Sequence, residues 1–137
     1  MIGIDTNILV RYLTNDDLVQ SNQVTALFIE YNGHEASIYI NNIVLCELVW
    51  VLEKGYKYTT SQIAGALKLI LQTPEFAFDN HQLLTQSVIE YERAGNADLS
   101  DIIISFVNNN AGCNATYSFD KKAIKFGYFE ELTMKDI

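Results

Sequence analysis

Short apolar runs alternate along this chain with longer amphipathic segments, and polar turns separate the two kinds of segment. Short runs rich in β-branched and aromatic residues are typical of buried strands, whereas apolar residues three and four positions apart are typical of helices. Residues 21–31 show the helical spacing, because Val24, Leu27, Phe28 and Tyr31 share one face. The alternation predicts an α/β fold in three layers, with a mostly parallel central sheet of about five strands flanked by helices.

The predicted elements follow each other in a regular order. We expect strands at residues 1–4, 37–40, 76–78 and 115–118, and a weak fifth strand at 129–132. We expect helices at residues 8–13, 21–31, 43–54, 82–93, 98–111 and 121–126, and another that Thr59 or Thr60 caps and that runs to residue 71. Residues 43–54 are apolar on nearly every side, but their length, the two asparagines before them and Gly55 after them favour a buried helix.

The length and composition predict one domain over residues 1–137. A chain of 137 residues, 49% of them hydrophobic and only one of them proline, can bury a single core. No apolar run approaches the roughly 18 residues that a membrane span requires, and the N-terminus does not resemble a signal peptide. We therefore expect a cytoplasmic protein without a membrane segment. Cys46 and Cys113 have aliphatic neighbours and are expected to be reduced core residues.

The net charge of −8 argues at first against nucleic acid as a partner, because surfaces that bind phosphates without sequence preference are basic. Net charge describes only the mean field, however. Carboxylates that hold cations can present a neutral or positive face locally. Nucleic acid therefore remains open as a partner.

Two acidic residues follow predicted strands. Asp5 comes after the first strand and Asp120 after the fourth. The carboxyl ends of parallel strands are where α/β proteins bind ligands, which makes both residues site candidates. Each also precedes a predicted helix, so the alternative that it is only a helix N-cap stays open for both.

Glu47 lies within the apolar segment 43–54, where Val44, Leu48 and Val51 are among its neighbours. We expect its carboxylate to be largely buried, and a buried charge requires a partner or a metal ion. The only basic residue of the same segment is Lys54, about two helical turns away. A salt-bridged structural glutamate is the alternative.

Asp98 and Asp101 are three residues apart at the start of a predicted helix, a spacing that puts both on one face. We assign the helix cap to Asp98 and a place in the site to Asp101, because Asp101 adjoins the apolar run of that helix. The alternative is that both residues only compensate the helix dipole.

A fold that brings several of these carboxylates together needs protons or cations to neutralise them. Two like charges about 4 Å apart repel by roughly 4 kcal/mol at an effective dielectric constant near 20. Ligands that are all oxygen suit Mg²⁺ or Mn²⁺ and do not suit zinc. The acidic candidates are Asp5, Glu47, Asp101 and Asp120.

Four segments, in their order and spacing, resemble the PIN-domain ribonucleases, and among them the VapC-like toxins of bacterial toxin–antitoxin pairs. They are IDTNILVRYL at residues 4–13, LCELVWVL at 45–52, ADLSDII at 97–103 and TYSFD at 116–120, so the resemblance covers essentially the whole chain. It implies a PIN-like fold with Asp5, Glu47, Asp101 and Asp120 as the acidic quartet, of which Asp5 and Asp101 are the firmest metal ligands. Supporting roles fall to Thr6, Asn7, Asp98 and Ser118.

The resemblance implies metal-dependent hydrolysis of RNA phosphodiester bonds with Mg²⁺ or Mn²⁺ as cofactor. Glu47 would hold a water or act as general base, and Asp120 would complete the ligand set. Arg11, Lys121 and Lys122 are the nearest candidates for phosphate contacts. The partners implied are an RNA substrate, a small antitoxin protein that inhibits cleavage, and a second copy of the chain in a homodimer.

The sequence departs from the family at residues 102–105, where three isoleucines and a serine stand in place of smaller, alanine-rich residues. Two other functions remain open: a PIN-fold nuclease that processes RNA without being a toxin, and a catalytically silent module that binds RNA or protein. A phosphotransferase of the haloacid-dehalogenase type would need an aspartate at the position of Asn7. A receiver-like phosphoacceptor would need adjacent acidic residues after the first strand, and these are missing.

Overall fold

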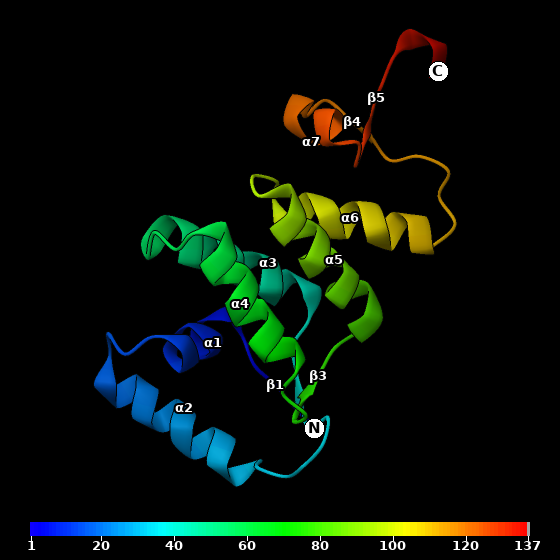
Figure 1. The fold of residues 1–137 in the computed structure, drawn as a ribbon. Coiled ribbons are helices and arrows are strands. Elements are labelled where there is room, and N and C mark those ends of the chain that lie inside the picture. Colours follow the sequence, from blue (N-terminus) through cyan, green and yellow to red (C-terminus); the bar gives the residue numbers. More distant parts are fainter. Residues whose placement is uncertain (137) are drawn as a thin grey trace. The chain divides into compact units, whose positions relative to one another are not determined.

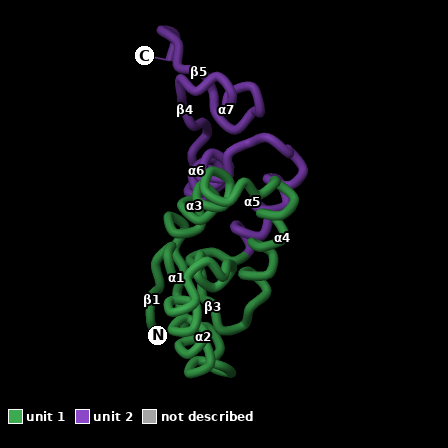
Figure 2. Tube along the Cα trace, turned by 90° about the vertical axis from the view of Figure 1, so that its left-hand side faces the viewer, with its two compact units in different colours: residues 1–81 green, residues 82–137 purple. Residues whose placement is uncertain are grey.

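The computed structural model describes residues 1–136 and confirms an α/β fold with parallel strands. The chain divides into two compact units, which Figure 2 shows in different colours. Unit 1 comprises Met1–His81, and unit 2 begins at Gln82. Each unit has its own small parallel sheet and its own helices.

Unit 1 contains a three-stranded parallel sheet in the order β1-β2-β3 and four α-helices (Figure 1). Ile2 lies opposite Ile38, which lies opposite Phe76. The strands are two residues long, shorter than the apolar runs that predict them. The elements in chain order are β1 (Ile2–Gly3), α1 (Thr6–Leu13), α2 (Leu18–Glu30), β2 (Ile38–Tyr39), α3 (Asn42–Trp50), the π-helical turn η1 (Val51–Gly55), α4 (Thr60–Leu71) and β3 (Phe76–Ala77).

The core of unit 1 is aliphatic, with an aromatic cluster at one side. Leu9 of α1, Ile38 of β2 and Leu48 of α3 are fully buried. The ring of Phe28 lies 4.9 Å from that of Tyr12 and 5.6 Å from that of Phe76, in edge-to-face arrangements that link α1, α2 and β3.

Side-chain caps define where α3 and α4 begin, as the sequence predicts. Asn41 precedes α3 and its side chain accepts a hydrogen bond from the Val44 amide at 3.0 Å. Thr59 and Gln62 form a reciprocal capping box at the start of α4. Residues 43–54 are helical as expected, although their last turn widens into the π-helical η1.

The described part of unit 2, which ends at residue 136, contains three α-helices, a two-stranded parallel sheet and a 3₁₀ turn. Its elements are α5 (His81–Ala94), which starts at the last residue of unit 1, α6 (Leu99–Asn110), β4 (Tyr117–Ser118), α7 (Lys121–Phe126), β5 (Glu130–Glu131) and the 3₁₀ turn η2 (Met134–Asp136). Tyr117 of β4 lies opposite Glu130 of β5. Gly127, with φ +87°, ends α7 in the left-handed conformation that glycine adopts without strain.

The two cysteines differ from the expectation that both are core residues. Both thiols are free, but Cys46 is only partly buried and Cys113 is exposed. Cys113 follows Gly112 in the turn after α6, beyond the last buried turn of that helix, so aliphatic neighbours in sequence do not enclose it. Burial, helped by the charge of Glu47, raises the pKa of the Cys46 thiol to about 11. No helix within residues 1–136 is long and apolar enough to span a membrane.

Candidate functional site

Asp5 stands between β1 and α1, at the N-cap position of the helix. Its side chain makes no capping hydrogen bond, so the helix does not occupy this carboxylate. Asp5 is exposed and lines a pocket of about 410 Å³, together with Asn7 and Arg11. Asp5 therefore occupies the N-cap position of α1, but its carboxylate does not cap the helix.

Glu47 is exposed, and the expectation that it would be buried is wrong. Helix α3 is apolar on nearly every side, yet only the face with Val44 and Leu48 is buried. Ile43, Glu47 and Trp50, at spacings of four and three residues, form an exposed stripe along the helix. A helix that is apolar all round does not reveal from its sequence which face will meet the core.

Thr6 connects Glu47 to the start of α1. The buried Thr6 hydroxyl donates a hydrogen bond of 3.1 Å from Oγ1 to Glu47 Oε2. The alternative of a structural salt bridge has no support in the described part of the chain, since Lys54 lies 3.6 Å from Glu53 and no cation pairs with Glu47. Thr6 thus holds one carboxylate oxygen in place, and Asp5 immediately precedes Thr6.

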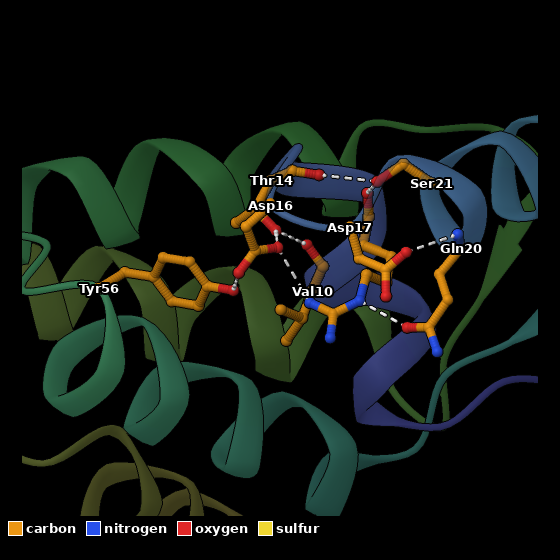
Figure 3. A network of polar contacts seen from close by, with 8 residues as sticks. Val10, Thr14, Asp16, Asp17, Gln20, Ser21 and Tyr56 are labelled. Carbon is orange, nitrogen blue, oxygen red and sulfur yellow. Dashed lines mark hydrogen bonds and ion pairs between the residues drawn. The ribbon is translucent and has the colours of Figure 1, made fainter.

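Arg11, a candidate for contact with phosphate, is held by neighbours in its own unit. Its Nη1 donates to Asp16 Oδ1 at 3.1 Å and its Nε to Gln20 Oε1 at 2.7 Å. Asp16 also accepts hydrogen bonds from the Thr14 hydroxyl at 3.0 Å and from the Tyr56 hydroxyl at 2.5 Å (Figure 3). The bond from Tyr56, followed by those from Thr14 and by the charge of Arg11, holds the pKa of Asp16 below its ordinary value.

Asp101 lies within electrostatic reach of both Asp98 and Asp120 in unit 2. Asp101, in the first turn of α6, is partly buried, and burial is the main reason that its pKa is raised. The charges of Asp98 and Asp120 raise the pKa of Asp101 further, and the nearby Lys122 lowers it. Helix α6 and the turn after β4 therefore place Asp101 where two other carboxylates repel it.

The helix caps of unit 2 differ from the assignment made from the sequence. Asp98 occupies the N-cap position of α6, but its side chain makes no capping hydrogen bond, and Lys122 Nζ lies 3.9 Å from its Oδ1. The predicted capping role of Asp98 is wrong, because its carboxylate faces this cation of α7. Asp120, by contrast, caps α7 by accepting from the amides of Lys122 at 3.0 Å and Ala123 at 3.1 Å.

Ser118 supports the same turn. Its Oγ accepts a hydrogen bond of 2.9 Å from the Asp120 backbone amide, so it fixes the backbone at Asp120 and does not bind the carboxylate. The candidate residues thus form two sets. Asp5, Thr6, Asn7 and Glu47 belong to unit 1, and Asp98, Asp101, Ser118 and Asp120 belong to unit 2.

The chemistry of these donors suits a hard divalent cation, because all of them are oxygens. A cation beside Asp101 would also relieve the repulsion that raises its pKa. Within residues 1–136, no group of three or more histidine, cysteine, aspartate or glutamate side chains is close enough to hold a metal ion. The donor types of unit 2 fit a metal, while their spacing here is that of separate carboxylates.

Two features of these sites escaped the sequence reasoning. Gln20, Gln23 and Leu27 line the pocket beside Asp5. Their spacing of three and four residues places all three on one face of α2. Phe119 is exposed immediately before Asp120. A bulky apolar residue within a polar turn was the signal available for Phe119.

Comparison with known proteins agrees with the resemblance seen in the sequence. The chain is 22% identical over 125 residues to the VapC ribonuclease of Aquifex aeolicus (strain VF5), an alignment that covers 91% of each chain. A family model described as the PIN domain matches residues 2–127, which include every candidate residue of both units. The chain therefore belongs to the PIN domain family.

Proposed function

We propose that this protein is a metal-dependent ribonuclease that hydrolyses RNA phosphodiester bonds. The observation that carries the proposal is that Asp98 and Asp120 both repel the partly buried Asp101, in a chain of the PIN domain family. Like charges held together destabilise a fold unless a cation compensates them. A bound cation would offset this repulsion at Asp101.

The residues of both units have distinct roles in this proposal. Asp5 and Asp101 would provide carboxylate oxygens for Mg²⁺ or Mn²⁺, and Asp120 would add a further oxygen. A bound ion would stabilise negative charge on the phosphate and lower the pKa of water. Glu47 acts as general base: the Thr6 hydroxyl holds its Oε2, and its Oε1 has no hydrogen-bond partner among the described residues and is free to accept a proton.

Cleavage of a labelled RNA with chelator and with added Mn²⁺ tests this proposal. We expect cleavage only with the metal, and we expect Asp101→Asn to abolish it. Glu131→Gln, which changes an exposed carboxylate of β5, is the matched control and should cleave as the wild type does. Metal-independent cleavage that persists in Asp101→Asn would come from a contaminating nuclease, and a complete lack of cleavage would refute the proposal.

We further propose that the nuclease is the toxin of a toxin–antitoxin pair. Support comes from the likeness to the Aquifex aeolicus VapC ribonuclease. The inhibitor would be a small protein that directs a basic side chain toward the carboxylates, since an arginine complements an acidic site. A protein encoded beside this chain should then co-purify with it and suppress cleavage. A neighbour that neither binds nor inhibits would leave an RNA-processing nuclease as the function.

A homodimer in the cytoplasm, with residues 1–137 acting as one domain, completes the proposal. Ile43 and Trp50, which are 69% and 52% exposed on α3, give an apolar surface that a second copy would bury. Sedimentation at micromolar concentration should show the dimer, and Ile43→Glu should shift it toward monomer. A wild type that sediments only as monomer would exclude the homodimer.

A further inference from the structure

Helix α7 is the most basic element of an acidic chain. Three of its six residues are lysines and none is acidic, although the whole chain carries a net charge of −8. A cationic segment in a protein of opposite net charge provides a local field that differs in sign from the mean field.

The three lysines have different surroundings. Lys122 lies 3.9 Å from the Asp98 carboxylate and is engaged within unit 2. Lys121 and Lys125 are both exposed, are four residues apart and therefore share one face of α7. Neither forms an ion pair with any residue in the range 1–136. Their charges are available to an anion from solution.

Phe119 lies two residues before Lys121 and is 77% exposed. Burying such a side chain would stabilise the fold, and this turn forgoes that gain. The other aromatic residues nearby are engaged: the rings of Phe126 and Tyr128 stack at 5.8 Å, and the Tyr117 hydroxyl donates to Asp136 at 3.3 Å. Phe119 has no ring contact with a described residue, and most of its side chain is open to solvent.

We propose that Phe119, Lys121 and Lys125 form a contact for single-stranded RNA, in which a base stacks on Phe119 and the lysines neutralise phosphates. Only an unpaired base exposes a face for stacking, and an aromatic side chain beside cations is how proteins hold single strands. Asp120 lies between Phe119 and Lys121 in the chain, so the strand passes a candidate catalytic carboxylate. The contact names the substrate class of the proposed ribonuclease and rests on that function.

Base stacking and phosphate neutralisation depend differently on salt, so RNA affinity measured over a range of salt concentrations distinguishes them. The probe is a short fluorescein-labelled oligouridylate, followed by anisotropy in chelator so that it is not cleaved. Each phosphate neutralised on a single strand contributes about 0.7 to the slope of log K against log salt. The double variant Lys121→Gln and Lys125→Gln should therefore flatten the slope by about 1.4. Phe119→Ala should weaken binding by roughly five- to a hundredfold and leave the slope unchanged.

Matched controls separate this contact from a general effect of charge or folding. The double variant Lys54→Gln and Lys57→Gln makes the same change in net charge in unit 1 and should bind with the wild-type slope. Phe119→Leu keeps an apolar side chain without a ring, and should lose nearly as much affinity as Phe119→Ala. A duplex RNA should be insensitive to Phe119→Ala, since its bases are not free to stack.

Several outcomes would overturn the contact: wild-type binding by Phe119→Ala, an equal flattening of the slope by the unit 1 lysine variants, or a change of oligomeric state in Phe119→Ala, which would make this surface a protein interface. Parallel cleavage assays with Mn²⁺ distinguish failure of the contact from failure of the function. If the wild type cleaves no RNA but the variants lose binding as predicted, only the ribonuclease function is refuted. Cleavage with unchanged binding refutes only the contact.

Discussion

The surroundings of each carboxylate decide whether the protein itself uses it or leaves it available. Asp16 accepts hydrogen bonds from Thr14 and Tyr56 and faces a guanidinium, so it is fully engaged. Asp5 is exposed without a capping bond, and Asp101 is partly buried beside two other acids. Their surroundings thus distinguish Asp16, a structural acid, from Asp5 and Asp101, which remain available as candidate functional acids.

Glu47 shows how this rule yields a prediction for one residue. Because Glu47 is exposed and accepts only the Thr6 bond, Glu47→Gln should change the free energy of unfolding by less than about 0.5 kcal/mol. Thr6→Val, which removes a buried hydroxyl, should cost about 1 kcal/mol. Cleavage by Glu47→Gln should fall about a hundredfold or more. Melting curves in chelator beside a cleavage assay measure both effects, and a variant that melts much lower yet still cleaves would make Glu47 structural.

The two thiols should react at different rates. Cys113 is exposed, whereas burial raises the pKa of Cys46 to about 11, so little Cys46 thiolate exists at mildly alkaline pH. A disulfide reagent should label Cys113 quickly and Cys46 slowly. In Cys113→Ser the fast phase should vanish. If Cys46→Ser removes the fast phase instead, the assignment of the two thiols is reversed.

At the start of a helix, one residue can have both a capping role and a candidate catalytic role. Asp120 caps α7 through two amides and is also a candidate ligand. Asp120→Asn keeps an oxygen acceptor and should preserve the cap, while Asp120→Ala should cost about 1 kcal/mol of stability. Both should lose RNA cleavage. Urea unfolding compared with cleavage separates the roles, and an active Asp120→Asn would confine this residue to capping.

The connection between α1 and α2 should carry a pH-dependent part of the stability. The folded-state pKa of Asp16 lies below its ordinary value of 3.8, chiefly because of the Tyr56 hydroxyl, so the ionised carboxylate stabilises the fold above pH 3.8. That contribution is lost as the pH falls through the folded-state value. Tyr56→Phe should therefore lower the urea midpoint at neutral pH, by an amount that shrinks below pH 3.8. Tyr58→Phe is the control, and an equal shift in it would mean that the effect does not come from the hydrogen bond between Tyr56 and Asp16.

At the scale of the whole molecule, excess negative charge links folding to cations. If Mn²⁺ binds the folded chain, it stabilises the fold by about 2.7 kcal/mol at a concentration a hundredfold above Kd. Asp101→Asn should gain much less from Mn²⁺. In chelator it should melt at the same temperature or higher, because the raised pKa of Asp101 means that its charge opposes folding. Melting at matched ionic strength tests this, and an equal gain from Mn²⁺ in both proteins would refute the role of Asp101.

Local signals in the sequence predict the elements well. Helix α7 occupies the expected residues 121–126 because Asp120 and Gly127 define its two ends. Asn41 and Thr59 likewise precede the helices that they were expected to cap. Strands are less well bounded, since only the residues paired across a ladder are strand and apolar runs extend beyond them.

The candidate residues could be named from the sequence, but their surroundings could not. The exposure of Glu47 depends on which face of an apolar helix meets the core, and the ion pair of Asp98 depends on Lys122 from a different helix. The engagement of Arg11 likewise needs Asp16, Gln20 and their hydrogen bonds. Such features come from tertiary packing, on which local patterns carry no information.

Trp50 has an optical consequence. It is the only tryptophan of the chain, and it lies on the exposed stripe of α3, three residues from Glu47. Intrinsic fluorescence excited at the indole therefore comes from a single position beside a candidate general base, without any label. A macromolecule or peptide that covers this stripe should shift the emission toward the blue as water leaves the ring, and should protect it from quenching by iodide. The protein thus carries its own spectroscopic reporter at the point where a partner would approach Glu47.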